Sequence, residues 1–366
     1  MSDSERVQLE DEFQKFTLEA ATLSLMNYRF LDSTGPRYVT AENRMSIAKR
    51  TLKYALGLFM AEKTRNLVEG LEGHATSILR DEREEQRRLE QGVSEEWQEP
   101  LDLLTVFVAL TKGVRSLFDD QFLNEATLSG GITFATLAVL HARACQVSSE
   151  ILVLLRCGFA DGAYARWRTL YELSAVSLFI EKNGKEVAER YLFHETLERS
   201  RLARQYQQGR YPGVSSRLSQ EWIDNLASLQ DYLLKAYGKQ FKENYGWAAS
   251  VLSGNPTLQR IAESVGLGDS YPAYRLASTS VHASALSTFR LSVPEAPLGR
   301  AVHASPNAIG LKSPGYYCAR SLEVITTALL KCQPGLDDHA VLKRGTILRS
   351  LRVLVSRVLK GNYIRK

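Results

Sequence analysis

An arginine and a histidine lie seven residues apart in the segment SYPAYRLASTSVHASALSTF, as Arg275 and His282. In a helix this separation is close to two turns, so both side chains would share a face, about 10 Å apart along the axis. Ser278 lies between them on the same side. An arginine offers a fork of donors to a phosphate, and a histidine can exchange a proton near neutral pH.

That arrangement suits metal-free cleavage of RNA, in which the ribose 2′-hydroxyl attacks the neighbouring phosphate. His282 would act as base or acid, and Arg275 would stabilise the developing charge. The structural alternative is a helix whose small residues allow close packing against a neighbour.

A second charged pair interrupts an apolar helix predicted from Gly162 to Lys182. Arg168 and Glu172 are four residues apart, so they share a helix face that is otherwise largely apolar. A carboxylate there would be desolvated, and its burial without a partner would be costly. Glu172 should therefore meet Arg168, a histidine or a tyrosine hydroxyl, or carry a proton. The pair either borders a functional site or is an ion pair between helices.

The segment ERYLFHETLERSR places Arg190, His194 and Glu198 on successive turns of one helix face. Its HETLE core lacks the second histidine of the HExxH zinc-protease motif, so we expect no metal there. The sequence also contains no P-loop, Rossmann glycine pattern or nucleophile elbow, and we expect no cofactor. Arg190 and His194 would line or brace a pocket, or belong to a salt-bridged helix surface.

Helical periodicity runs through nearly every long segment, and Gly, Pro or Asn-Gly dipeptides separate the segments. The predicted fold class is therefore all-α, a multi-helix bundle. Besides the helix with the charged pair, helices are predicted over residues 132–157, 185–208, 218–237, 271–289, 316–331 and 337–360, and near Trp247 and Leu258. Four prolines between Val293 and Gly315 indicate a long irregular loop, of a kind that is often functional.

Three regions are expected: an N-terminal helical region (1–128), a main helical domain (129–336) and a basic C-terminal helix (337–366). The first would contain two or three helices up to about Gln91, with a charged arm near residues 80–91. A break would follow from Gly92 to Pro100, and then a helix over residues 101–122. The basic C-terminal helix would contact nucleic acid or acidic lipid, or pack its apolar stripe on the body.

The composition is that of an ordinary globular protein, with 44% hydrophobic and 24% charged residues in 366. The four scattered cysteines fit neither a disulfide scaffold nor a zinc site, and we interpret them as reduced packing residues. We find no apolar run of membrane-spanning length, and the N-terminus is charged, so we expect no membrane span and a cytoplasmic location. The net charge of +5 permits a polyanionic partner without requiring one.

Several phrases resemble an uncharacterised bacterial family, one of the numbered domains of unknown function. They are SSEILVLLRCGFADGAYARWRTLYELSAVSLFI, RYLFHE, YGWA, ASTSVHAS and LKSPGYYCARSL. The resemblance covers roughly residues 150–330 and is close in word order and spacing. It implies an intracellular α-helical protein and carries no established activity.

Arg275 and His282, with six residues between them, also resemble the motif of HEPN domains (higher eukaryotes and prokaryotes nucleotide-binding), an Arg and a His separated by four to six residues. Arg190 and His194 have only three residues between them and do not match. The resemblance implies a HEPN-like core, often dimeric, and a ribonuclease of a toxin or anti-phage system. Leu276 stands where that family usually has a polar residue, which leaves a non-catalytic relative as an alternative.

Two hypotheses follow. The first is a metal-independent endoribonuclease, with RNA as substrate, a homodimeric site and an unidentified partner protein of a defence system. In it Arg275 and His282 are catalytic. The residues that would line or brace the pocket are Arg168, Glu172, Arg190, His194 and Ser278. The second is a non-catalytic helical binding or scaffold protein, in which the buried polar residues only specify packing.

Overall fold

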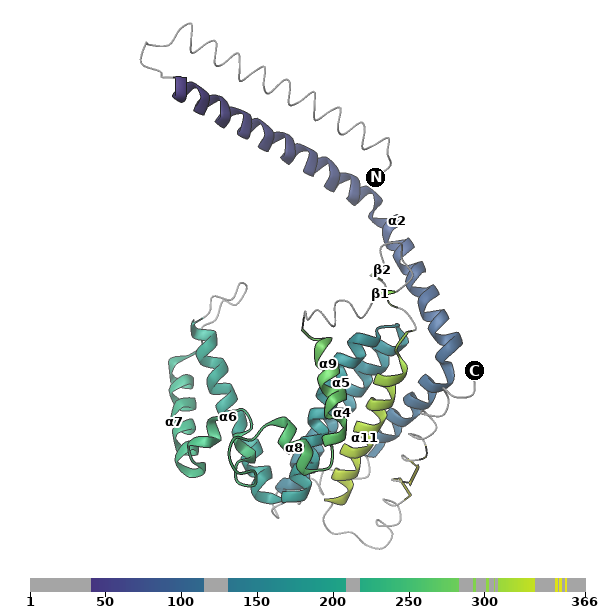
Figure 1. Ribbon diagram of the computed structural model, residues 1–366, viewed down its shortest axis with the longest axis vertical. Helices are drawn as coiled ribbons and strands as arrows, with labels where there is room; N and C mark the ends of the chain where they lie inside the picture. The colour runs from purple at the N-terminus through teal and green to yellow at the C-terminus, as the bar shows by residue number, and fades with distance from the viewer. Residues whose placement is uncertain are drawn as a thin grey trace. The chain divides into compact units, whose positions relative to one another are not determined.

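The computed structural model describes residues 41–114, 131–208, 218–282 and 309–332, with short pieces at 292–293, 301–302, 306, 346–347, 349–350 and 353. The chain divides into two units, Met1–Glu85 and Gln86–Lys366. Every long element in the described ranges is an α-helix (Figure 1), which confirms the all-α multi-helix bundle. Nearly all of the predicted basic helix over 337–366 lies outside the described residues.

Helix α2 (Ala41–Gly113) is continuous where several helices and a break from Gly92 to Pro100 were predicted, so that prediction was wrong. Side-chain hydrogen bonds four residues apart run through the expected break, from Gln91 to Glu95, Ser94 to Gln98 and Gln98 to Asp102. Pro100 removes one N–H from the helix, but the carbonyl that loses its donor belongs to the exposed Glu96, where water can replace it. Val93, Leu101 and Leu104 of this stretch are buried in the core, and this packing, together with the local pairs, stabilises the helix through one glycine and one proline.

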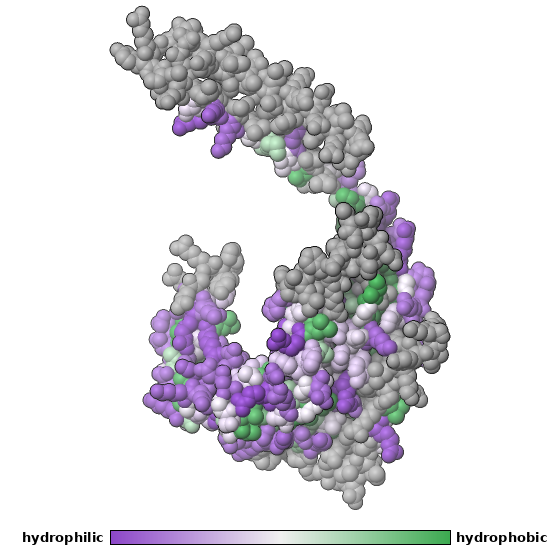
Figure 2. Space-filling view, viewed as in Figure 1, coloured by the Kyte–Doolittle hydropathy of each residue, from purple (hydrophilic) through white to green (hydrophobic). Residues whose placement is uncertain are grey.

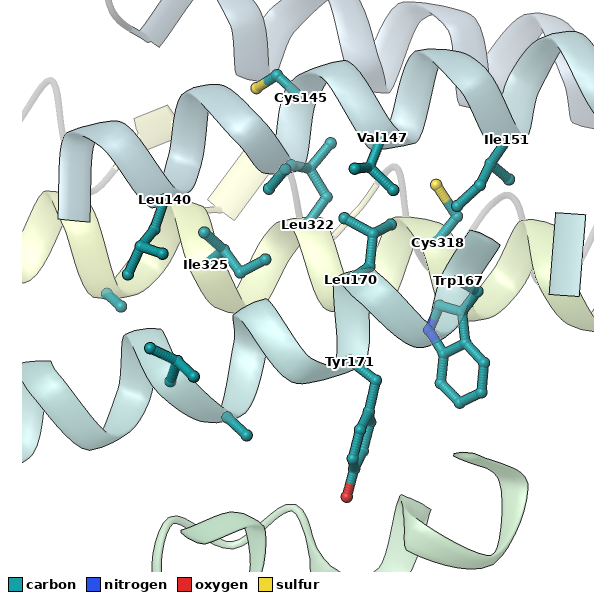
Figure 3. Packing of buried hydrophobic residues seen from close by; sticks show 14 of the residues in the cluster. Leu140, Cys145, Val147, Ile151, Trp167, Leu170, Tyr171, Cys318, Leu322 and Ile325 are labelled. Atoms are coloured by element: carbon teal, nitrogen blue, oxygen red, sulfur yellow. The ribbon is translucent and has the colours of Figure 1, made fainter. Parts of the chain in front are cut away.

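Three helices form the centre of the second unit: α4 (Ile132–Arg156), α5 (Ala160–Asn183) and α11 (Lys312–Lys331). Figure 3 shows side chains of all three helices meeting in a buried layer formed by Leu140, Val147, Ile151, Leu170, Cys318, Leu322 and Ile325. Each large apolar side chain buried in this way contributes about 1.5–3 kcal/mol. Trp167 is 1% exposed, stacks on Tyr317 and donates its indole N–H to Ser321 Oγ at 3.0 Å.

The ends of these helices follow from glycines that were visible in the sequence. Gly158 and Gly184 have φ of 78° and 73°, a left-handed conformation that is costly for residues with a Cβ, so α4 and α5 end there as predicted. Helix α11 begins at Lys312, earlier than the predicted start at residue 316. Pro314 lies in its first turn, where a helix needs no backbone N–H.

Helix α4 corrects one expectation about membranes. Among the described residues it is the single helix long and apolar enough, by length and composition, to cross a bilayer, whereas the sequence reading found no such run. Half of that apolar stretch is buried inside the protein, where α4 packs on α5 and α11. A buried core helix meets the same criteria of length and composition.

The remaining elements follow α5 in the chain. They are α6 (Lys185–Gln208), α7 (Gln220–Tyr237), the 3-10 helices η2 (Lys239–Lys242) and η3 (Gly246–Ala248), α8 (Leu258–Ser264), the 3-10 helix η4 (Gly268–Ser270) and α9 (Tyr271–Thr279). Helices α6 and α7 lie side by side as a hairpin (Figure 1). Within the predicted irregular loop, β1 (Ser292–Val293) and β2 (Ala301–Val302) form a two-residue antiparallel ladder.

Candidate functional site

The last residue of helix α9 is Thr279, so the helix is ten residues shorter than the predicted helix, which was to end at Phe289. The hydroxyls of Ser278 and Thr279 bond to carbonyls of their own helix, and Ser280 and Val281 donate to residues only three positions back. Such local bonds and tight turns compete with helix continuation. His282 therefore lies in a turn after α9, and the prediction that it shares a helix face with Arg275 was wrong.

Both residues of the predicted catalytic pair are nevertheless open to solvent. Arg275, on α9, and His282 are each classed by their accessible area as exposed. Ser278 is half-buried, and its hydroxyl is engaged with the carbonyl of Tyr274, 2.9 Å away. Arg275 and His282 are thus accessible from the solvent, whereas the Ser278 hydroxyl is bonded to the backbone of its own helix.

Arg168 and Glu172 of α5 meet α9 through a single tyrosine hydroxyl. The Tyr274 hydroxyl accepts a hydrogen bond from Arg168 Nη2 at 3.1 Å and donates one to Glu172 Oε1 at 2.8 Å. The guanidinium of Arg168 also lies 5.1 Å from the centre of the Tyr274 ring. Arg168 and Glu172 themselves are 3.9 Å apart. The predicted partners of Glu172, Arg168 and a tyrosine hydroxyl, are both present.

Glu172 is less buried than its apolar neighbours suggested. Its side chain is 41% exposed, and that of Arg168 is 22% exposed, so the pair lies at the edge of the core. The expectation of a desolvated carboxylate was therefore wrong. Glu172 remains reachable from solvent while its position is held by Tyr274.

Four tyrosines surround this pair. Tyr274 stacks on Tyr171 at 5.0 Å and on Tyr271 at 5.5 Å, and Tyr171 donates its hydroxyl to the Leu267 carbonyl. Burial, with a further contribution from Glu172 and the neighbouring tyrosines, raises the pKa of Tyr245 to about 12. Burial also raises the pKa of Tyr274. The phenols of Tyr245 and Tyr274 therefore stay neutral at physiological pH, and Tyr274 acts as a hydrogen-bonding and stacking group.

Sequence reasoning missed the roles of Tyr245 and Tyr274. Tyr271 and Tyr274 are three residues apart in SYPAYR, a spacing that places both on one face of α9 and could have indicated their contact with α5. Tyr245 lies in an irregular segment, where no periodicity points to its neighbours.

Arg190 and His194 of α6 belong to a different cluster, which fastens the segment between α7 and α8. Arg190, 6% exposed, donates to the carbonyls of Trp247 and Gly246 and stacks over Tyr237 and Phe241. His194, 2% exposed, bonds through Nε2 to the Glu243 carbonyl at 2.8 Å. Both side chains therefore fasten this segment to α6.

His194 also contacts the third residue of its predicted face. Its Nδ1 lies 3.5 Å from Glu198 Oε1, and this hydrogen bond lowers the pKa of the Glu198 carboxyl. The cluster around Arg190 and His194 and the tyrosines near Glu172 are linked by one short stretch of chain. Glu243, Gly246 and Trp247 are held by α6, while Tyr245 between them lies near Glu172.

The cysteines behave as packing residues in the parts of the chain that the structure describes. All four are free thiols, and burial raises the pKa of Cys145 to about 11 and that of Cys318 to about 12. Such thiols stay protonated and are poor nucleophiles and metal ligands. No three His, Cys, Asp or Glu side chains among the described residues gather into a group that could hold a metal ion.

Comparison with protein families finds one match. Residues 134–294 match the profile of a family of unknown function (DUF5677), which confirms the resemblance to an uncharacterised family. The match begins before the predicted residue 150 and ends before α11, so LKSPGYYCARSL lies outside it. No curated protein matches the chain. No solved structure matches it either.

Proposed function

We propose that this protein is a HEPN-like, metal-independent ribonuclease in which Arg275 and His282 carry the reaction. The observation that supports the proposal is the exposure of both side chains, Arg275 on α9 and His282 in the turn that follows it. Tyr274, the residue before Arg275, anchors that helix to Arg168 and Glu172 of the core. A rigid anchor next to an exposed donor is the arrangement that positioning of a phosphate requires.

In the proposed reaction, His282 removes the proton of the ribose 2′-hydroxyl, whose oxygen then attacks the adjacent phosphorus. Arg275 donates hydrogen bonds to the phosphate oxygens, on which negative charge develops. The bond from phosphorus to the 5′-oxygen breaks, that oxygen takes a proton from water, and protonated His282 returns its proton to the solvent. The products are a 2′,3′-cyclic phosphate and a 5′-hydroxyl.

Cleavage of a labelled single-stranded RNA tests this assignment. His282→Ala should lower the rate by about 10²–10⁴-fold, the usual contribution of a general acid–base residue. Arg275→Ala should also lower it, whereas Arg199→Ala, which removes an exposed arginine from α6, should not. The products should end in a 2′,3′-cyclic phosphate. The proposal fails if the wild-type protein leaves RNA intact both with and without divalent metal.

The wider context of the ribonuclease proposal is a cytoplasmic toxin or anti-phage effector that acts as a homodimer with a partner protein. Overexpression should then slow bacterial growth, and His282→Ala should relieve the effect. Sedimentation of the wild-type protein should give twice the chain mass of 41.0 kDa. A monomer at all concentrations would contradict the dimer.

The second candidate is a non-catalytic helical binding or scaffold protein. The observation that favours it is that Arg168, Glu172, Arg190 and His194 are all engaged with other groups of the protein. If this alternative holds, neither the wild-type protein nor His282→Ala cleaves RNA, and Arg190→Ala destabilises the fold. The RNA assay above separates the two candidates.

A further inference from the structure

Helices α6 and α7 and the segment after them enclose a hollow of about 540 Å³, within the range of small-ligand sites. Three cationic side chains line it, Arg201, Arg204 and Lys242, and Glu243 is the single carboxylate in the lining. Three positive charges and one negative charge leave a balance of +2. In Figure 2 the surface over α6 and α7 is predominantly hydrophilic.

Both arginines of the hollow are held in place by neutral groups. Arg201 Nη1 donates to Asn244 Oδ1 at 3.1 Å. Arg204 donates to the carbonyl and the hydroxyl of Ser200 and to the side-chain oxygen of Gln230 on α7. Ser200 in turn donates to Gln230 at 2.7 Å. Because amides and a hydroxyl do the holding, the positive charges of both guanidinium groups are left uncompensated by these bonds.

The arginines also retain donors for a ligand. Within the bonds between described residues, Arg201 uses only Nη1, and Arg204 leaves its Nη1 unused. Glu198 is the nearby carboxylate that attracts Arg201, but its hydrogen bond is to His194. A guanidinium that is pre-oriented and has free N–H groups is the preferred donor for phosphate oxygens.

We propose that this hollow binds the phosphate group of a phosphate ester, with Arg201, Arg204 and Lys242 as its ligands. The charge of +2 matches a phosphate dianion, and the amide oxygens of Asn244 and Gln230 accept hydrogen bonds that hold the two arginines in place. The ester is either a free nucleotide-like molecule or the backbone of RNA. The assignment stands apart from the ribonuclease proposal, because none of its residues belongs to the Arg275–His282 pair.

Calorimetric titration with sodium pyrophosphate tests the site. The wild-type protein should bind it, and Arg201→Gln with Lys242→Gln should weaken binding by about tenfold or more. The matched control is Arg199→Gln with Lys239→Gln, which removes the same charge from exposed positions on α6 and η2 outside the hollow. The control should bind as the wild type does. Equal weakening in both variants, or no binding by the wild type at millimolar pyrophosphate, overturns the proposal.

A second variant guards against misfolding. Asn244→Asp keeps all three cations but places a carboxylate against Arg201, so it should also weaken pyrophosphate binding while circular dichroism stays unchanged. Unchanged pyrophosphate affinity in this variant would contradict the assignment of Arg201.

The two sources of phosphate are separated by a labelled single-stranded RNA, with His282→Ala as the background. If the Arg201→Gln, Lys242→Gln change weakens RNA binding together with pyrophosphate binding, the ester is RNA. If it weakens pyrophosphate binding alone, the ester is a free phosphate compound. Because His282→Ala should not alter pyrophosphate affinity, failure of the ribonuclease proposal and failure of this one give different results.

Discussion

Two arginine–histidine pairs, one on α6 and one at α9, use the same residue types for different purposes. Arg190 and His194 are 6% and 2% exposed, and both bond to backbone carbonyls of the segment after α7. Arg275 and His282 are exposed. The difference teaches that the residue types of such a pair do not decide whether its side chains are buried against backbone carbonyls or exposed at the surface.

The cause of the difference lies in what each pair faces. The segment after α7 consists of the short 3-10 helices η2 and η3, whose carbonyls are not all satisfied within the segment. The Glu243 and Gly246 carbonyls already accept backbone N–H groups of the segment, and Arg190 on α6 supplies the donor for the Trp247 carbonyl. Arg275 lies on the outer side of α9, while the inner side presents Tyr274 to α5.

The largest expected effect comes from exchanging the buried arginine. Arg190→Ala removes the arginine donor of the Trp247 carbonyl and the cation above two aromatic rings, so it should cost about 3 kcal/mol or more. Arg275→Ala is the matched control and should change the stability by about 0.5 kcal/mol or less. Urea unfolding measures both. Equal losses would show that the contrast between the pairs is wrong.

A third histidine, His141, is buried like His194 but lies against a threonine hydroxyl. His141 is 3% exposed, its Nε2 lies 3.1 Å from Thr326 Oγ1, and burial lowers its pKa to about 4. The unfolded chain, with an ordinary histidine pKa near 6.5, binds the proton more readily between these two values. Stability is thus fully present above pH 6.5 and is lost as the pH falls toward 4, by on the order of 3 kcal/mol.

Urea unfolding of the wild type and His141→Leu at pH 7.5 and pH 4.5 measures this loss. The variant should lose less stability on acidification, since it lacks the imidazole that takes up the proton, and the Thr326 hydroxyl still donates to the Leu322 carbonyl. Parallel pH profiles of the two proteins would exclude His141 as the group responsible.

The smallest effect should come from the hydroxyl that joins α9 to α5. Tyr274→Phe keeps the ring stacked on Tyr171 but removes the bridge between Arg168 and Glu172, at a cost of about 1 kcal/mol. In the matched variant Tyr271→Phe, no hydrogen bond between described side chains is lost, and thermal unfolding should be nearly unchanged. A smaller loss for Tyr274→Phe than for Tyr271→Phe would contradict the bridging role.

Part of the candidate site could be predicted because its logic is local. The four-residue spacing of Arg168 and Glu172 places them 3.9 Å apart, and Arg168 and a tyrosine hydroxyl were two of the partners predicted for Glu172. The identity of that tyrosine could not be predicted, since Tyr274 lies 102 residues from Glu172 in the chain. The helical relation of Arg275 and His282 failed because hydroxyl side chains end α9 between them.

The sequence by itself determined the helical class and the helix ends at Gly158, Gly184 and Gly238, because periodicity and left-handed glycines act within a few residues. The bounds of α6 at Lys185 and Gln208 belong to the same category. The tertiary structure alone decided which charged side chains are spent on the fold and which stay available. Whether a charged side chain is used in this way depends on its burial and on partners far away in the chain. Arg190, for example, donates to the carbonyl of Trp247, 57 residues away, and no local sequence pattern encodes this contact.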